Sequence, residues 1–287
     1  MFSSPMNSSG EELLLGGSDN ALMRWKLNMK DLVVKEKALT SDFLLSSTVT
    51  NKGVISNDLW DSDTTTYYDQ GSWGSCTAFA MKYMMHFYAL ANDSFTKDLI
   101  SVAYLYAKSR QYLNLSLSND SGASNAATTH IMQYSGTVTE AQYPYHALNV
   151  FTDPTTKFES TVLNTLTNKV QFFQFKFCSS ASINVTNLKS TLMVKPILVG
   201  LLLFPSALTN ATMISGNIPL PTKSDLKKGP VGGHAVCITG FTDTTFTFRN
   251  SWGTEVGIAG NFTIPIEYLT AQSSNGYMKY VFDCWTY

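Results

Sequence analysis

The spacing of the hydrophobic residues changes near residue 170, and this change constrains the fold more than any other feature. Before it, apolar residues recur every three or four positions, as on one face of a helix. After it, they come in short runs separated by Gly, Pro and Asp, as in strands. With 287 residues, 44% of them hydrophobic, the chain is long enough for two packed lobes. We therefore expect an α+β protein, with a helical lobe at about 68–165 and an antiparallel β-barrel lobe at about 166–287.

Three helices and six strands follow from these patterns. The first helix begins near Cys76, because apolar residues at helical spacing follow it: Phe79, Ala80, Tyr83, Met84 and Phe87. Two further helices are predicted over Ser94–Arg110 and Ser121–Tyr134. The predicted strands are Phe173–Phe177, Ile197–Phe204, His234–Phe241, Phe246–Asn250, Asn261–Ile264 and Met278–Trp285.

The start of the first helix has the features of a nucleophile site. Gly71 and Gly74 make a flexible loop, and Ser75 can cap the helix by accepting a backbone N–H. Cys76 then lies in the first turn, where the helix dipole favours a negative charge. We therefore expect its thiol to ionise more easily than that of a free cysteine.

A cysteine nucleophile also needs a base, a group that orients the base, and donors for the oxyanion. His234 begins one predicted strand and Asn250 ends the next, so a hairpin brings them together. We expect His234 to take the thiol proton, Asn250 to fix the imidazole and Trp252 to shield that contact from water. Gln70 is placed to donate to the oxyanion beside the Cys76 N–H. Each residue alone is more typical of a core position, but together they predict catalysis.

Three sequence blocks carry a family resemblance: Gln-Gly-Ser-Trp-Gly-Ser-Cys at 70–76, Gly-Gly-His-Ala-Val at 232–236 and Arg-Asn-Ser-Trp-Gly at 249–253. They resemble the signature blocks of papain-like cysteine proteases, over about residues 58–285. The segments Leu220-Pro221 and 229–236 are similar to the corresponding segments in the branch of this family that is found in bacteria and large DNA viruses. The resemblance implies a two-lobe fold with the active-site cleft between the lobes.

By this resemblance, the chain is a cysteine endopeptidase, a hydrolase that cleaves polypeptides through a thioester and needs no cofactor. Gly122 would hydrogen-bond an extended substrate. A roomy pocket without charge would be lined by small residues: Ala123, Ser124, Gly200, Gly233 and Ala235. Three positions depart from the family pattern. Trp73 replaces a disulfide cysteine, Thr77 replaces a common aromatic residue, and Val256 stands where a second tryptophan is common.

Two other functions fit the same residues. The thioester can pass its acyl group to an amine rather than to water, which makes a transferase or transpeptidase, and the sequence does not separate these outcomes. A non-catalytic relative, acting as a structural or binding protein, is the other alternative. That alternative predicts a damaged site, whereas Cys76, His234, Asn250 and Gln70 are all present.

Residues 1–57 precede the part that resembles the family, and residues 58–287 form the expected peptidase domain. Within the extension, one predicted helix over Leu22–Val34 has an apolar face made by Leu22, Trp25, Met29, Leu32 and Val33. The helix either docks on the main body or covers the active site, and in the second case the extension is an inhibitory pro-segment.

Charge and cysteine usage limit the partners. The net charge of −1 argues against a nucleic-acid or anionic-membrane surface, and the apolar run 197–204 is too short to span a bilayer. The histidines and cysteines lack metal-ligand spacing, so no metal is expected. The scattered cysteines, Cys76, Cys178, Cys237 and Cys284, predict free thiols.

We expect an intracellular monomer, in host cytoplasm or a virion if the source is viral, with a polypeptide substrate. Seven Asn-X-Ser/Thr sequons occur, which chance explains in this composition.

Overall fold

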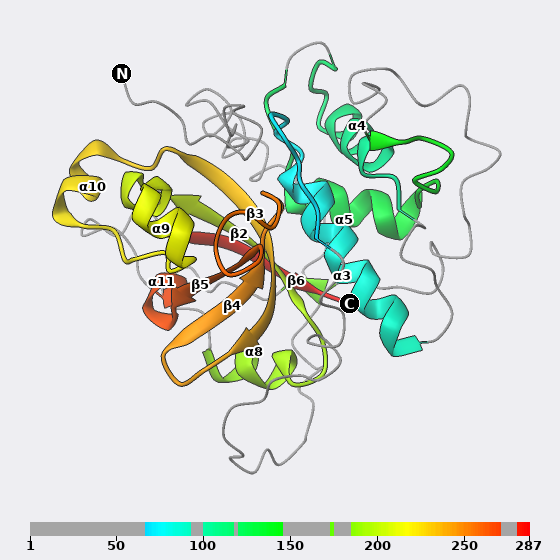
Figure 1. Ribbon diagram of the computed structural model, residues 1–287. Coiled ribbons are helices and arrows are strands. Elements are labelled where there is room, and N and C mark those ends of the chain that lie inside the picture. The colour runs from blue at the N-terminus through cyan, green and yellow to red at the C-terminus, as the bar shows by residue number, and fades with distance from the viewer. Residues whose placement is uncertain (1–66, 93–99, 118–119, 146–172, 175–184, 271–279) are drawn as a thin grey trace.

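The computed structural model describes residues 67–92, 100–117, 120–145, 173–174, 185–270 and 280–287. The N-terminal extension with its predicted helix, Cys178 and most of the predicted strand at 173–177 lie outside these ranges. The described elements form two lobes, a group of helices and an antiparallel sheet, with α3 (Cys76–Asn92) between them (Figure 1). The predicted α+β class with two lobes is confirmed.

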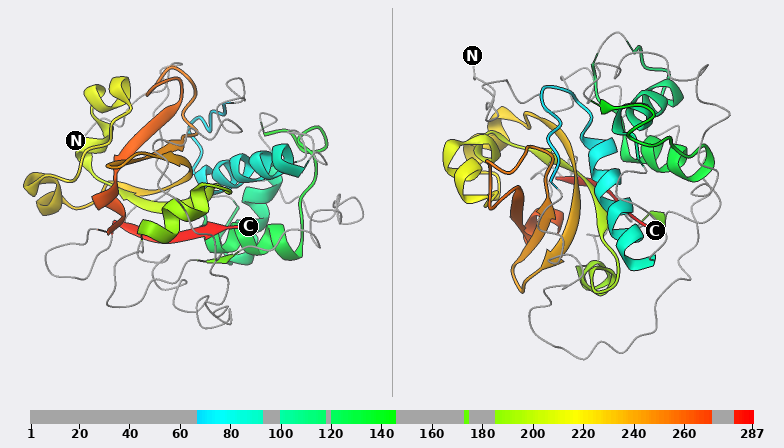
Figure 2. Two further views of the ribbon diagram at one scale, coloured as in Figure 1. Left: turned by 90° about the horizontal axis from the view of Figure 1, so that it is seen from below. Right: turned by 45° about the vertical axis from the view of Figure 1, so that its right-hand side comes forward.

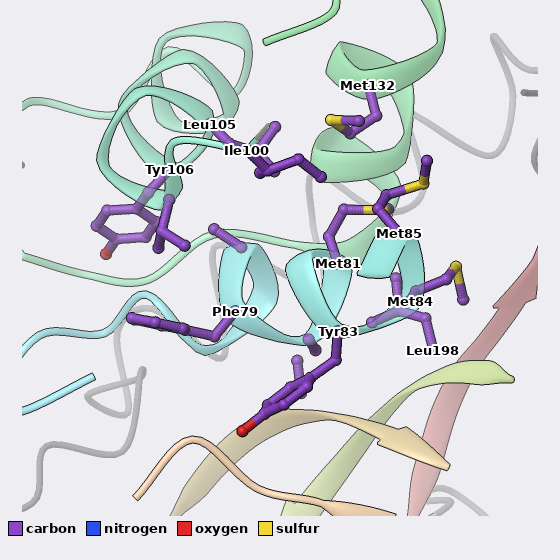
Figure 3. Packing of buried hydrophobic residues seen from close by; sticks show 14 of the residues in the cluster. Phe79, Met81, Tyr83, Met84, Met85, Ile100, Leu105, Tyr106, Met132 and Leu198 are labelled. Carbon is purple, nitrogen blue, oxygen red and sulfur yellow. The ribbon is translucent and has the colours of Figure 1, made fainter. Parts of the chain in front are cut away.

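The helical lobe consists of α3, α4 (Val102–Tyr112) and α5 (Asn125–Tyr134). The apolar surface of α3 is wider than the predicted stripe. Met81 and Met85 point toward α4 and α5, whereas Tyr83 points toward the strands (Figure 3). Residues 76–87 of α3 are all buried, Lys82 and His86 included, so α3 is the shared core element of the two lobes.

Serine caps set where the other two helices begin. Ser101 is extended, and its side chain accepts the Tyr104 N–H. Ser124 does the same for the Ala127 N–H. The predicted start at 121 is therefore wrong, because α5 begins four residues later. α4 begins after Ser101, and the predicted start at Ser94 lies outside the described residues. A serine side chain favours the cap because it satisfies an N–H that the first turn leaves without a partner.

The β lobe is one six-stranded sheet in the order β1-β6-β2-β3-β4-β5, with every neighbouring pair antiparallel. The described strands are β1 (Phe173–Gln174), β2 (Ile197–Leu203), β3 (Gly232–Phe241), β4 (Thr245–Arg249), β5 (Asn261–Pro265) and β6 (Val281–Thr286). The short helices of this lobe are α8 (Val185–Leu192), η3 (Pro205–Leu208), α9 (Asn210–Ser215), α10 (Lys223–Lys228) and α11 (Ile266–Thr270). The predicted antiparallel pairing of the β lobe is confirmed, and among the described strands β1 and β5 form the two ends of the sheet.

The two faces of the sheet contribute to different cores. Leu198 of β2 and Cys237 of β3 pack with α3, whereas their neighbours Val199 and Val236 pack in the core of the β lobe. Successive strand residues point to opposite faces, and here both faces are covered. This explains why β2 is an uninterrupted apolar run in the sequence. Figure 2 shows α3 in cyan beside the sheet, and α9 and α10 in yellow at the far end of the β lobe. Among the described residues, no helix is long and apolar enough to cross a membrane.

Candidate active site

The hairpin of β3 and β4 brings the predicted base and its orienting residue together. His234 lies near the start of β3, and Asn250 directly follows the last residue of β4. His234 Nε2 is 2.8 Å from Asn250 Oδ1, and both side chains are buried. The expected contact between the two residues is therefore present.

This contact also fixes the imidazole tautomer. Asn250 Oδ1 accepts a second hydrogen bond, 2.8 Å long, from the backbone N–H of Ser251. A backbone N–H can only donate, so the Asn250 atom between the two groups is the amide oxygen. Nε2 of His234 must then carry a proton, and Nδ1 is the nitrogen with a free lone pair. Nδ1 is buried and has no hydrogen-bond partner in the described residues, so it is available as a base.

Trp252 covers the contact, as the sequence predicts. Its ring stacks on the His234 ring with centroids 4.7 Å apart and an interplanar angle of 24°. Trp252 is itself almost fully buried and packs edge-on against Phe262 in the core of the β lobe. A hydrogen bond that is shielded from water is stronger than an exposed one, because water cannot compete for the donor or acceptor.

Cys76 is the first residue of α3 and reaches the same strand. The backbone N–H of Ala235, the residue after His234, acts on its thiol and lowers the thiol pKa. Burial raises the pKa of the Cys76 thiol to about 11, although the backbone groups of Ala235 and Thr77 act in the opposite direction. The expectation that the helix start alone makes this thiol ionise easily is therefore wrong, because desolvation outweighs the helix terminus.

Burial also acts against a lone charge on the base. It lowers the pKa of His234 to about 4, and the hydrogen bond to Asn250 offsets this only in part. A thiolate alone or an imidazolium alone is thus unfavourable at neutral pH. Transfer of one proton from Cys76 to His234 creates two opposite charges at once, which attract each other. The two groups are therefore expected to change charge together.

Gln70 is held in the loop before α3 by both ends of its side chain. Oε1 accepts a 2.6 Å hydrogen bond from Ser251 Oγ, and Nε2 donates a 2.7 Å hydrogen bond to the Trp73 carbonyl. An amide nitrogen has two protons, so one remains for a ligand. The N–H of Cys76 is among the donors at the helix start that have no intrahelical acceptor. Gln70 is completely buried.

Sequence reasoning missed several residues that hold this loop. Ser251, between Asn250 and Trp252, links Gln70 to the other lobe, and its only signal is its place in the third block. Asp120 accepts a 2.6 Å hydrogen bond from the Gly74 N–H. Tyr145 bonds both Gln70 and Ser75. Ser75 does not cap α3 as predicted: its Oγ bonds Tyr145, and its backbone carbonyl accepts the first helical hydrogen bonds.

The residue expected to bind substrate through its backbone is already engaged. The Gly122 N–H donates to the Tyr106 hydroxyl at 3.1 Å, and its carbonyl accepts from Arg110 Nη1 at 2.7 Å. A carbonyl oxygen can accept a second hydrogen bond, whereas the single N–H must first release Tyr106. A role for Gly122 in substrate binding stays a prediction.

The predicted pocket residues do not leave open space everywhere. A Cβ on Gly200 would lie 2.1 Å from the Phe282 ring and 2.5 Å from Asp283 Oδ1, so these side chains fill its place. The expectation of a roomy pocket without charge is wrong at Gly200. Ser124 is buried as the cap of α5, and Ala235 is buried against α3. The other two, Ala123 and Gly233, are half-buried.

The positions that depart from the family pattern are all packed. Trp73 contacts the helical core, Val256 contacts the core of the β lobe, and Thr77 is buried. Three cysteines in the described residues, Cys76, Cys237 and Cys284, are free thiols. The part of the chain that the structure describes contains no cluster of His, Cys, Asp or Glu suited to a metal ion.

Comparisons with known proteins give the family and the fold. A family model described as papain family cysteine protease matches residues 57–273. An uncharacterized peptidase C1-like protein of Acanthamoeba polyphaga mimivirus is 28% identical over 210 residues, which are 71% of this chain and 66% of that protein, slightly under two thirds of its length. Among solved structures, xylellain, a cysteine protease from Xylella fastidiosa, has a TM-score of 0.66 at 21% identity and covers 100% of this chain and 98% of its own.

Two other structures have the same fold. Procathepsin L 3 of Tenebrio molitor has a TM-score of 0.58 at 16% identity, covering 94% of this chain and 92% of its own. A cysteine protease of Carica candamarcensis, in complex with E-64, has a TM-score of 0.54 at 17% identity, and the match covers 79% of this chain and 94% of that protein's chain. At these identities the likeness shows the fold, and the family model shows the membership. The resemblance found in the three sequence blocks is thus confirmed, and the chain belongs to the papain family of cysteine proteases.

Proposed function

We propose that this protein is a cysteine endopeptidase that hydrolyses peptide bonds with Cys76 as nucleophile, His234 as base and Asn250 as the residue that orients the base. The observation that carries the proposal is the buried hydrogen bond between His234 Nε2 and Asn250 Oδ1. It leaves Nδ1 unprotonated on the residue next to Ala235, whose backbone N–H acts on the Cys76 thiol and lowers its pKa. This is the arrangement that an activated thiol requires.

The reaction proceeds in two halves. The Cys76 proton moves to His234 Nδ1, and the sulfur attacks the carbonyl carbon of the peptide. The resulting oxyanion accepts hydrogen bonds from the free Gln70 N–H and the Cys76 backbone N–H. His234 then gives its proton to the leaving amine, and the carbon–nitrogen bond breaks to leave a thioester. A water molecule loses its proton to His234, attacks the thioester and releases the carboxylic acid, which restores the thiol.

A polypeptide substrate is part of the proposal. The Carica candamarcensis protease was solved in complex with E-64, so a solved protein of this fold binds a compound of that kind. The chemistry of the site agrees, because a buried thiol with neutral donors around it suits an uncharged amide carbonyl. Transfer of the acyl group to an amine would use the same residues, and no contact in the described residues favours it.

The experiment is to incubate the purified protein with a mixed peptide library and identify new termini by mass spectrometry. We expect cleavage inside peptides, with each new carboxyl terminus being a free acid. Products joined to a second peptide would instead indicate acyl transfer. No new termini from either the full-length protein or a chain starting near Val54, while iodoacetamide still labels Cys76 in both, would reject the proposed peptidase.

We also propose that residues 1–57 inhibit the enzyme. These residues lie outside the described ranges, and the motive is the apolar-faced segment at 22–34 of the sequence. A tethered segment acts at an effective concentration of roughly millimolar, so even weak docking blocks a site. The full chain and a chain starting near Val54 are compared on one fluorogenic peptide, and equal activity of the two folded proteins rejects the idea.

A further inference from the structure

One buried hydroxyl contacts both ends of the loop that precedes α3. Tyr145 Oη lies 2.7 Å from the Gln70 carbonyl oxygen and 2.7 Å from Ser75 Oγ. Gln70 carries one of the oxyanion donors, and Ser75 directly precedes Cys76, which carries the other. All three side chains are buried.

The direction of these two hydrogen bonds follows from the groups involved. The Gln70 carbonyl can only accept, so Tyr145 uses its single proton there. Ser75 must then be the donor to the Tyr145 oxygen. Burial raises the pKa of Tyr145 well above its ordinary value, so the phenol keeps its proton at neutral pH. Ser75 therefore donates to Tyr145, and Tyr145 donates to the Gln70 carbonyl. The directions of both hydrogen bonds are fixed.

The loop between these two ends needs such support. It contains two glycines, and Gly71 has a φ of 57°, a backbone angle that glycine adopts without strain. The same freedom makes a glycine loop costly to order, because more backbone conformations are lost. Two further contacts hold its middle, from the Gly71 N–H to Asp69 and from the Gly74 N–H to Asp120.

Tyr145 itself is fixed by contacts that do not use its hydroxyl. Its ring meets Phe79 of α3 edge-on, with centroids 4.8 Å apart. Its backbone N–H donates to Glu140 at 2.7 Å, and Glu140 pairs with Lys82 of α3 at 2.9 Å. The phenol is thus attached to the helix that carries Cys76, and the hydroxyl can act as a fixed point for the loop.

From this geometry we infer that Tyr145 is a positioning residue for catalysis: its hydroxyl sets the spacing between the two oxyanion donors, the Gln70 side chain and the Cys76 backbone N–H. The inference rests on the proposed peptidase activity. Tyr145 does not touch the substrate. Its hydroxyl holds the backbone at Gln70 and the hydroxyl at Ser75, so that both donors meet one oxygen atom.

The effect belongs to the transition state. Donors at an oxyanion site act only when the carbonyl oxygen gains charge, so their misplacement lowers kcat and leaves KM nearly unchanged. Loss of a whole oxyanion donor costs roughly 100-fold or more. Loosening both donors without removing either should cost less, and we expect roughly a ten-fold fall in kcat for Tyr145→Phe, which keeps the ring contact with Phe79.

The test compares Tyr145→Phe with a matched variant, Tyr268→Phe. Tyr268 is also buried and donates to a backbone carbonyl, that of Leu202 at 2.6 Å, but it lies in α11 of the β lobe. Three quantities are measured in each protein: kcat and KM on a peptide that the library identifies, the rate of Cys76 alkylation by iodoacetamide, and the affinity for a peptide aldehyde of the same sequence. The aldehyde forms a tetrahedral adduct with the thiol and places an oxygen at the oxyanion site.

For Tyr145→Phe we expect kcat and aldehyde affinity to fall together by roughly ten-fold, with KM and the alkylation rate within about two-fold of wild type. Tyr268→Phe should lose thermal stability only. An unchanged kcat in Tyr145→Phe, or an alkylation rate that falls as much as kcat, would overturn the inference, since the second result means that the hydroxyl acts on the thiol.

Ser75→Ala keeps the test decisive if Tyr145→Phe does not fold. It removes the other hydroxyl and leaves the ring in place, so kcat and aldehyde affinity must fall in the same sense, and unchanged values contradict the inference. If neither the full chain nor a chain starting near Val54 cleaves any peptide, the proposed function is rejected instead. In that case the affinity for a peptide aldehyde of arbitrary sequence still reports on the oxyanion site in the wild type and the variants.

Discussion

The two halves of the site are positioned by different physical means. His234 and Asn250 are placed by the hairpin of β3 and β4, in which Cys237 pairs with Arg249. Gln70 and Cys76 are placed by a glycine loop that depends on side chains distant in the sequence, Tyr145 among them. Strand pairing fixes residues through the backbone itself, whereas a loop of this kind is only as rigid as the side chains that hold it.

The largest expected effect comes from replacing the nucleophile. Cys76→Ala should lower kcat/KM by roughly five orders of magnitude, because without the nucleophile of the catalytic triad no thioester can form. Cys237 is a matched control, since it is also buried and packs against the same helical core. Cys237→Ala should keep kcat and lose about 1 kcal/mol of stability. Activity is measured on a single peptide from the library, and substantial turnover by Cys76→Ala would disprove the assignment.

The next effect tests whether the two halves share one proton. Burial raises the pKa of the Cys76 thiol to about 11, and proton transfer to His234 is the route by which the thiolate forms at neutral pH. In His234→Ala the thiol should therefore react with iodoacetamide at least 100-fold more slowly at pH 7 than in the wild type, since the thiolate is the reactive form. The rate should rise continuously as the pH approaches 11.

The control is the wild-type protein over the same pH range. In the wild type the imidazole of His234 can accept the thiol proton. Alkylation of Cys76 should therefore already be fast near neutral pH. Identical pH profiles of the wild type and His234→Ala would mean that the two groups do not exchange a proton.

The sequence predicted the β half of the site better than the loop half, and the reason is physical. The short apolar runs and the turn between them are enough to indicate a hairpin, and a hairpin brings His234 to Asn250. The identities of Gln70 and Cys76 were also clear. Their support was not, because Tyr145 lies 75 positions beyond Gln70, and only the tertiary structure shows that its hydroxyl reaches the loop.

The errors of prediction have the same origin. The thiol pKa was predicted from the helix start alone, and the burial that dominates it comes from the packing of two lobes. The space beside Gly200 was judged from the small size of glycine, whereas Phe282 and Asp283, which lie 82 and 83 positions later in β6, fill it. Local patterns predict elements and their residues, but they do not predict what distant elements bring to them.

Asp283 provides a contact between the lobes that depends on pH. It is fully buried in β6, and its Oδ1 accepts a 2.8 Å hydrogen bond from Asn125 Nδ2 of α5. Burial raises the pKa of Asp283 from its ordinary 3.8 to about 6. The folded state thus binds this proton more tightly than the unfolded state, so its stabilising contribution is present below about pH 4 and is lost as the pH rises through 6.

We therefore expect the wild type to gain about 2 kcal/mol relative to Asp283→Asn when the pH falls from 7.5 to 4.5. The lowered pKa of His234 acts in the opposite sense, since its protonation favours the unfolded state as the pH falls below 6.5. Both proteins contain His234, so its effect cancels in their difference. Urea unfolding at the two pH values gives the four free energies, and parallel pH dependence of the two proteins would contradict the assignment.

The smallest expected effect comes from the contact that joins the two halves. Ser251 Oγ donates to Gln70 Oε1, and the Ser251 carbonyl accepts the Gln70 backbone N–H at 2.9 Å. Ser251→Ala removes only the first of these, so the loop stays paired and the Gln70 side chain gains freedom to rotate. We expect kcat to fall by less than about ten-fold with KM nearly unchanged, because one donor is loosened and none is lost.

Ser109 supplies the matched control. Its hydroxyl is equally buried and donates to the Leu105 carbonyl at 2.7 Å within α4. Both serine variants should lose about 1 kcal/mol of stability, but only Ser251→Ala should lose kcat.

A double variant of Ser251→Ala and Tyr145→Phe sharpens the comparison further. Both residues hold Gln70, one by its side chain and one by its carbonyl, so the two losses in kcat should combine to less than their product. A fully multiplicative loss would mean that the strand side and the loop side hold the oxyanion donor independently.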